Sequence, residues 1–218
     1  EESYRPQHHP HHDQAWAVFA YLAIEKGADP LLQERLRVAL RHFARSEFLD
    51  PAAKRGMGGA ANWYRPMAWG GLTQPEDLPL LASFGLAGDA AALDGAESTL
   101  GLLLGANPLN LSYVSGLGSR QPDGIFHPDS WMHLGPQQVA PGLLAMGPSA
   151  YQKEGDPKAG PWDVSFTHLS FYPPAKGWPA LELYADARIC YPMNEFTVGQ
   201  IAMVAANFGM LAGSAEGN

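Results

Sequence analysis

The sequence contains a single cysteine, Cys190, which excludes an internal disulfide and leaves the compartment open. Long apolar runs are also lacking: nowhere do about 18 or more apolar residues follow one another, so we expect no membrane span. The first residues lack the basic start and apolar stretch of a signal peptide. Because Glu1 is not a translation start, we expect that upstream sequence has been removed.

Positive charge is scarce. Lysine and arginine number 14 against 22 acidic residues, which gives a net charge of −8. A chain of this kind lacks the basic surface that binds a phosphate backbone, so we exclude nucleic acid as a partner. Neither a Gly-x-Gly-x-x-Gly nor a Walker loop is present, and Gly-x-Ser-x-Gly is absent. These absences exclude dinucleotide-binding, nucleotide-binding and nucleophile-elbow enzymes.

What is present suits a folded, loop-rich chain. With 218 residues and 46% hydrophobic residues, the chain has enough apolar material for one domain or a part of one. Its 24 glycines and 19 prolines indicate helices joined by long ordered loops. We treat residues 1–218 as a single unit of mainly α class.

Apolar residues at helical spacing predict five helices. They run from Asp13 to Gly27, from Asp29-Pro30 to before Asp50, from a capping box at Thr73–Glu76 to about Leu86, from about Ala92 to Gly105, and from about Glu195 to Ala212. In the second helix the pattern places Leu32, Leu36, Ala39 and Phe43 inward and Arg35, Arg37, Arg41 and Arg45 outward.

The remaining long stretches read as loops. Residues 51–71 are rich in glycine and aromatic residues. Residues 106–194 show little periodicity apart from two strand-like pieces, 111–114 and 180–184. Long structureless loops in a compact domain are usually functional, so we expect 106–194 to form a cleft and carry the chemistry.

Two segments carry a family resemblance. The stretch from Leu104 to Arg120, with Ser112-Tyr113-Val114-Ser115-Gly116, is similar to a segment of glycoside hydrolase family 9 that leads to a histidine and an arginine in the sugar cleft. His127 occupies the histidine position, one residue late, and Asp129 stands where the family has arginine. The second segment matches the family's acid signature, aromatic-x-Asp-(four)-aromatic-(three)-Glu-x-small, with Tyr184, Asp186, Tyr191, Glu195 and Thr197.

The resemblance implies an (α/α)6 toroid with an open cleft and inverting hydrolysis of β-1,4-linked glucans. It assigns Glu195 as the catalytic acid. The family's catalytic base lies in an Asp-Ala-Gly-Asp segment that is absent here, and five helices are too few for the full toroid. The chain therefore resembles the C-terminal half of such a domain, with the missing N-terminal half as its expected partner, or a relative that has lost the base.

Physical chemistry supports an acid role for Glu195. Inverting hydrolysis needs a protonated carboxyl and a carboxylate about 6.5–9.5 Å away that activates water. At a loop-to-helix junction Glu195 can be surrounded by Tyr191, Met193 and Phe196, whose desolvation favours the protonated form. The alternative is a glutamate that only caps a helix.

Other acids have open roles. Asp186 either orients Tyr191 or a sugar hydroxyl, or accepts backbone N–H bonds in a loop. Asp123, Asp129 and Asp163 are conceivable substitutes for the base, although loop aspartates mostly form turns.

Aromatic side chains offer flat faces for sugar rings. Tyr64, Trp69 and Trp131 are the expected stacking residues; Trp63, Trp162 and Trp178 are further loop tryptophans. His127 and His133 can hydrogen-bond sugar hydroxyls or serve the structure. The cluster at His8–His12 reads as a solvated tail rather than a metal site.

The leading hypothesis is a secreted or periplasmic glycoside hydrolase that acts on a β-linked glucan. No cofactor is required; the resemblance allows a calcium ion that steadies the loops. One rival is a non-catalytic glycan-binding protein. Another is a polysaccharide lyase that uses Tyr191 and His127, since helical toroids also host β-elimination.

Overall fold

The computed structural model describes residues 11–50, 53, 78–135, 138–148, 170–174, 178–179 and 182–216. Its helices are α1 (His11–Leu22), α2 (Pro30–Ala44), the π-helical turn η1 (Arg45–Leu49), α4 (Leu78–Ala87), α5 (Ala90–Leu103), α6 (Pro128–His133), α7 (Tyr191–Asn194) and α8 (Val198–Glu216). Within these residues there is no β-strand, only an isolated bridge between Val114 and Leu144. The described part is mainly α, as predicted.

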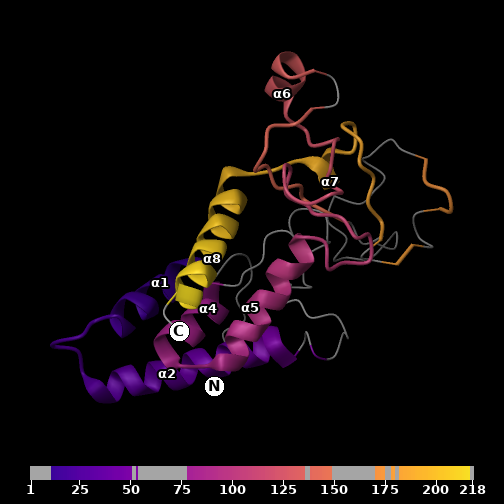
Figure 1. Cartoon of the computed structure of the whole chain (residues 1–218). Coiled ribbons are helices and arrows are strands. Elements are labelled where there is room, and N and C mark those ends of the chain that lie inside the picture. Colours follow the sequence, from indigo (N-terminus) through magenta and orange to yellow (C-terminus); the bar gives the residue numbers. More distant parts are fainter. Residues whose placement is uncertain are drawn as a thin grey trace.

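The longer helices gather at one end of the molecule and the segments between α5 and α8 at the other, with α6 projecting outward (Figure 1). Helix α4 packs against both α2 and α5. One apolar core joins these helices to η1 and consists of Ala44, Phe48, Leu80, Leu81, Ala92 and Ala96. None of the described helices is long and apolar enough to span a lipid bilayer.

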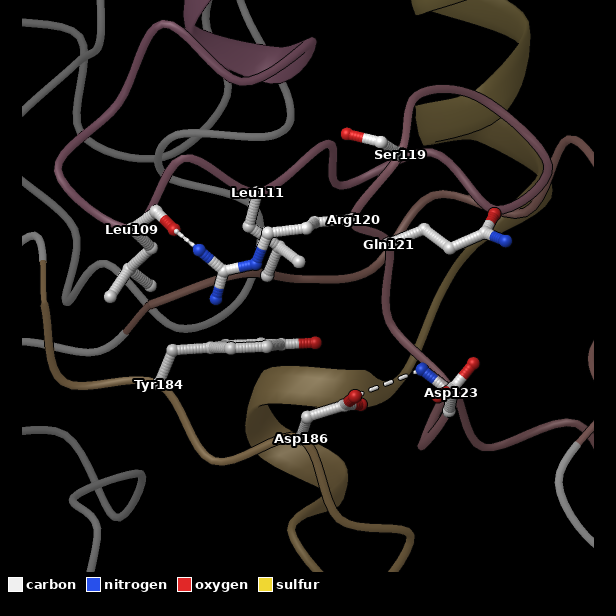
Figure 2. Close-up of a pocket in the computed structure, with 8 residues that line it drawn as sticks. All are labelled: Leu109, Leu111, Ser119, Arg120, Gln121, Asp123, Tyr184 and Asp186. Atoms are coloured by element: carbon white, nitrogen blue, oxygen red, sulfur yellow. Dashed lines mark hydrogen bonds between the residues drawn. The ribbon is translucent and has the colours of Figure 1, made fainter.

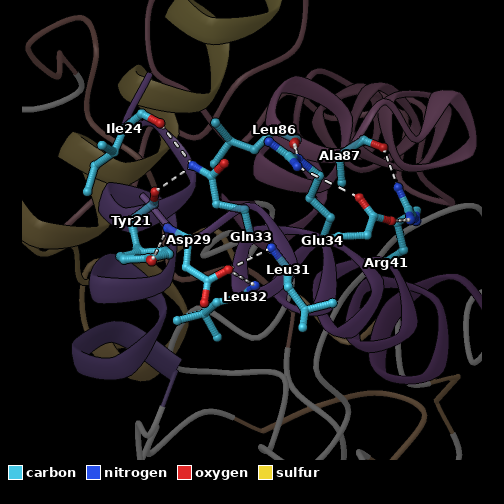
Figure 3. A network of polar contacts seen from close by, with 11 residues as sticks. Tyr21, Ile24, Asp29, Leu31, Leu32, Gln33, Glu34, Arg41, Leu86 and Ala87 are labelled. Carbon is cyan, nitrogen blue, oxygen red and sulfur yellow. Dashed lines mark hydrogen bonds and ion pairs between the residues drawn. The ribbon is translucent and has the colours of Figure 1, made fainter. Parts of the chain in front are cut away.

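The start of α2 forms as the sequence predicts. Asp29 is the N-cap: its Oδ1 accepts the backbone N–H of Leu31 at 2.8 Å and of Leu32 at 3.3 Å, and Pro30 follows in the first turn. Gln33 adds hydrogen bonds to the carbonyls of Tyr21 and Ile24, which tie α2 to the end of α1 (Figure 3).

The predicted faces of α2 are wrong in part. Leu40 and Ala44 are buried, whereas Leu32 and Ala39 are exposed. Arg37 and Arg41 are not simply solvated: Arg37 Nε donates to Leu86 O at 3.1 Å and Arg41 Nη1 to Ala87 O at 2.8 Å. These arginines donate hydrogen bonds to the last carbonyls of α4. The face of α2 that packs against the other helices therefore differs from the face that its apolar pattern predicts.

A second core fastens the loop end to the helices. It joins Leu100 and Leu103 of α5 and Val204 of α8 to loop residues Leu111, Tyr113, Val114 and Leu144. Gly116, with φ of +80°, lies so close to Pro141 that a β-carbon would stand 2.6 Å from its side chain. The two loop segments, 111–120 and 140–147, therefore pack directly on one another.

Several other expectations can be compared with the structure. Helix α8 begins at Val198 rather than at Glu195. Residues 111–114 make only the single bridge, and residues 106–194 include α6 and α7. The loop at 51–71, apart from Ala53, the capping box at 73–76 and residues 180–181 lie outside the described residues.

Candidate active site

Glu195 stands between two helices rather than inside one. It is the residue at which α7 ends, with φ −69° and ψ 164°, and α8 starts three residues later. Its own N–H donates to Tyr191 O at 2.7 Å. Its side chain is half-buried. Because α8 starts only at Val198, Glu195 does not lie in its first turn, where the alternative interpretation places it.

Two loop segments are hydrogen-bonded to the backbone at and just before Glu195. The N–H of Met146 donates to Glu195 O and that of Gly147 to Met193 O, both at 2.9 Å. The N–H of Phe126 donates to Asn194 O at 2.8 Å. Glu195 is thus held by contacts that come from about 50 to 70 positions earlier in the chain.

Asn194, which precedes Glu195, is fully buried and organises the loop before it. Its Nδ2 donates to the carbonyls of Ala185 at 2.6 Å, Cys190 at 3.0 Å and Ala187 at 3.1 Å. Its Oδ1 accepts the hydroxyl of Tyr184 at 2.6 Å. Sequence reasoning missed this residue, which falls in the unspecified spacer of the acid signature.

Asp186 connects the Glu195 loop to the segment that leads to His127. Its two carboxylate oxygens accept the N–H of Asp123 at 2.9 Å (Figure 2) and the N–H of Gly124 at 2.7 Å. A β-carbon at Gly124 would stand 2.7 Å from Ala187 N, so only glycine fits this approach. In the structure Asp186 therefore accepts backbone N–H bonds in a loop, which is one of the two roles expected from the sequence.

The pKa of Asp186 is raised above its ordinary value. Desolvation of the carboxyl is the main cause, and the nearby charge of Asp123 adds to it. The two amide hydrogen bonds act in the opposite direction. The residue as a whole is exposed, but its carboxylate oxygens lie against the backbone of residues 123–124. This backbone shields the carboxylate from water, which explains why its pKa is raised.

His127 caps α6 through one ring nitrogen. Ser130 Oγ accepts the N–H of Ala140 at 2.9 Å and lies 2.6 Å from His127 Nδ1, which also accepts Ser130 N–H at 3.2 Å. With Nδ1 acting as acceptor, the neutral ring carries its proton on Nε2, which has no hydrogen-bond partner among the described residues. The ring lies 5.4 Å from that of Phe196, so this donor stands beside the Glu195 segment.

The described aromatic candidates are largely engaged with protein groups. Arg188 covers one face of the Trp131 ring at 4.3 Å, and Phe126 meets the ring edge-on at 5.3 Å. Trp178 donates its indole N–H to Pro173 O at 2.7 Å and packs near Leu183. Tyr191 is half-buried in the first turn of α7. Their contacts with sugar stay predictions.

Several candidates cannot be placed. Tyr64, Trp69, Trp63, Trp162, Asp163, His8 and His9 lie outside the described residues. Asp123 and Asp129 are exposed on the loops, and His133 ends α6 as an exposed residue. In the described ranges no three His, Cys, Asp or Glu side chains come together as a metal site requires.

The fold and this geometry define a mainly helical protein with a carboxylic acid site built from loops at one end of its helices. The chain belongs to glycosyl hydrolase family 9, whose family profile matches residues 58–207. The family resemblance read from the two segments is therefore confirmed.

Solved structures share the fold. A metagenome-derived family 9 endoglucanase is 24% identical, with a TM-score of 0.64 over 90% of this chain and 32% of its own. A thermostable endoglucanase from Alicyclobacillus acidocaldarius is 21% identical, with a TM-score of 0.66 over 91% of this chain and 35% of its own. A family 9 protein from Bacteroides ovatus is 21% identical, with a TM-score of 0.66 over 90% and 32%.

The chain spans about a third of the length of these relatives. No curated protein matches it significantly. The chain corresponds to a portion of the (α/α)6 barrel of these relatives. This explains why the sequence predicts fewer helices than a whole barrel contains.

Proposed function

We propose that this chain is the acid-bearing portion of an inverting glycoside hydrolase that cleaves a β-linked glucan. The observation that carries the proposal is the placement of Glu195. Its half-buried carboxyl follows a short helix, and its backbone is hydrogen-bonded to loops that also bring His127 alongside. A carboxyl held in this way is suited to protonate a glycosidic oxygen, because its position is fixed before substrate arrives.

The other groups fit the same chemistry. His127 offers an Nε2–H donor that can bind a sugar oxygen without changing its own protonation state. The base comes from sequence beyond this chain, since inversion requires a second carboxylate on the opposite face of the sugar. Calcium binding and a secreted or periplasmic location belong to the same proposal.

The relatives support this substrate class. Two of the similar structures are described as endoglucanases, and AaCel9A, 22% identical, was solved with a cellobiose-like isofagomine. An oligosaccharide of β-linked glucose is therefore the substrate to test first.

The test is release of reducing ends from a panel of β-glucans by the full-length protein, which includes the sequence that supplies the base, and by its Glu195→Gln variant. Removing a general acid lowers rates by about 10²- to 10⁴-fold, so we expect the variant to lose nearly all activity. Glu97→Gln, the same change at an exposed site on α5, serves as the matched control and should keep full activity. Equal activity in the Glu195→Gln variant would remove Glu195 from the mechanism.

One observation favours the rival, glycan binding without hydrolysis. Among the described acids near Glu195, Asp186 already has both oxygens bonded to backbone amides and is poorly placed to activate water. Binding of cello-oligosaccharides without release of reducing ends would support the rival. Unsaturated, ultraviolet-absorbing ends would indicate the lyase.

A further inference from the structure

A pocket of about 560 Å³ opens beside the Glu195 loop, and the family assignment gives it no role. It is lined by Leu109, Leu111, Ser119, Arg120, Gln121, Asp123, Tyr184 and Asp186. Figure 2 shows Arg120 and Leu109 along one side and Tyr184 and Asp186 along the other. Pockets that hold small ligands range from about 300 to 1,000 Å³, so this one has room for a sugar unit.

The pocket holds a cation and a carboxylate that do not pair with each other. Arg120 makes one side-chain hydrogen bond, from Nη1 to Leu109 O at 3.0 Å, and no described carboxylate lies within ion-pair distance of it. The Asp123 carboxylate accepts no hydrogen bond from a described residue. Arg120 thus retains free donors and Asp123 free acceptors, both exposed at the pocket.

Three of the remaining polar side chains already have protein partners, whereas the Ser119 hydroxyl has none among the described residues. Asp186 is bonded to two amides, Gln121 Oε1 accepts the N–H of Gly116, and the Tyr184 hydroxyl donates to Asn194. These bonds set the shape of the pocket and leave Arg120 and Asp123 as its main recognition groups. Leu109, Leu111 and the Tyr184 ring supply apolar surface between them.

We propose that this pocket binds one glycosyl unit of the glycan, with Asp123 accepting from sugar hydroxyls and Arg120 donating to sugar oxygens. Each sugar hydroxyl is both donor and acceptor, so a glycosyl unit that lies between the two groups can donate to the Asp123 carboxylate and accept from the Arg120 guanidinium. A simple anion would be repelled by Asp123 and Asp186, and a simple cation by Arg120. The proposal rests on the proposed function for its ligand class.

The pocket is linked to Glu195 through one side chain. Tyr184 lines the pocket, and its hydroxyl is bonded to Asn194, the residue before Glu195. A glycosyl unit against Tyr184 therefore binds a group that positions the acid. We expect occupancy of the pocket to hold the Glu195 loop in its observed arrangement.

The test is calorimetric binding of cellotetraose to the whole chain carrying Glu195→Gln, which prevents turnover. Adding Arg120→Ala or Asp123→Asn should raise Kd about tenfold or more, since each removes hydrogen bonds to a charged group. Arg45→Ala and Asp94→Asn, exposed changes on η1 and α5, are the matched controls and should leave Kd unchanged. Circular dichroism confirms that each variant is folded.

The outcomes separate this proposal from the proposed function. Binding that depends on Arg120 and Asp123, without release of reducing ends by the full-length wild-type protein, supports the pocket and rejects hydrolysis. Hydrolysis that depends on Glu195, with Kd and KM unchanged in both pocket variants, rejects the pocket and keeps the function. No binding of cellotetraose in any form overturns the pocket proposal.

Discussion

The Asn194 side chain makes four hydrogen bonds in the loop that leads to Glu195. Four partners share one fully buried amide: three carbonyls of the preceding loop and the hydroxyl of Tyr184. An aspartate could not replace it, since its oxygens would face those carbonyls. The amide therefore fixes the path of the chain into Glu195, and the arrangement of the acid depends on it.

We expect Asn194→Ala to lower the free energy of unfolding by about 2–4 kcal/mol, because three carbonyls each lose one donor and the Tyr184 hydroxyl loses its acceptor. Tyr184→Phe, which removes one bond of the set, should cost about 1 kcal/mol. Guanidinium unfolding curves measure both. Asn207→Ala is the control: this asparagine is also buried, but its Nδ2 has no partner within the described residues. An equal loss in both Asn→Ala variants would show that volume, not hydrogen bonding, sets the cost.

At the level of elements, α2 and α4 are held together by charged groups as well as by apolar packing. Glu34 lies 3.7 Å from Arg37 and 3.3 Å from Arg41. Arg37 donates to Leu86 O, and Arg41 donates to Ala87 O at the end of α4 (Figure 3 shows Arg41). A carbonyl at a helix end has no partner inside its helix. The arginines of α2 supply that partner, so they stabilise the C-terminal end of α4.

Arg41→Ala should therefore destabilise the protein by about 1 kcal/mol, a value reduced by the exposure of the side chain. Arg45→Ala removes only an exposed pair with Asp50 at 3.7 Å and should change stability by less than about 0.5 kcal/mol. Denaturant midpoints of the two variants make the comparison. The interpretation fails if the two substitutions cost the same.

The elements also show where sequence reasoning succeeds. Long periodic segments and the Asp29 cap predict the existence of the longer helices, although α1 ends at Leu22 rather than at Gly27 and α8 begins at Val198 rather than at Glu195. Helix α7 has four residues and α6 six, too few to display a period, so both were missed. The backbone between α7 and α8 accepts hydrogen bonds from the N–H groups of Met146 and Gly147. Residues so far apart in the chain cannot be recognised as partners from the local sequence pattern. The acid role of Glu195 stays a prediction, and its extended backbone could not be read from neighbouring residues.

At the scale of the whole molecule, the chain matches about a third of the length of each relative, and helix α2 has large apolar side chains exposed on its surface. Three large apolar side chains of α2 are exposed: Leu31 by 70%, Val38 by 53% and Leu32 by 40%. Positions 31 and 38 lie two helical turns apart on one face. Such a surface normally packs against another element or another molecule.

The chain alone should thus associate with itself as its concentration rises. Leu31→Glu together with Val38→Glu should reduce this association, because the new charges must be desolvated in any contact. Sedimentation velocity over a range of concentrations measures the effect. Leu117→Glu changes an apolar residue that is also exposed, in a loop, and should leave the association unchanged. A wild-type chain that stays monomeric throughout would contradict the prediction.

The close approach at Gly124 has a consequence for anyone who wishes to redesign this protein. A side chain at position 124 would collide with the backbone of Ala187, so no residue other than glycine fits there. Beyond it, the side chains of Asp129 and Met132 are exposed. A combinatorial library should hold Gly124 and Asp186 constant and randomise the exposed positions, which would vary the surface beside the acid while the scaffold stays intact.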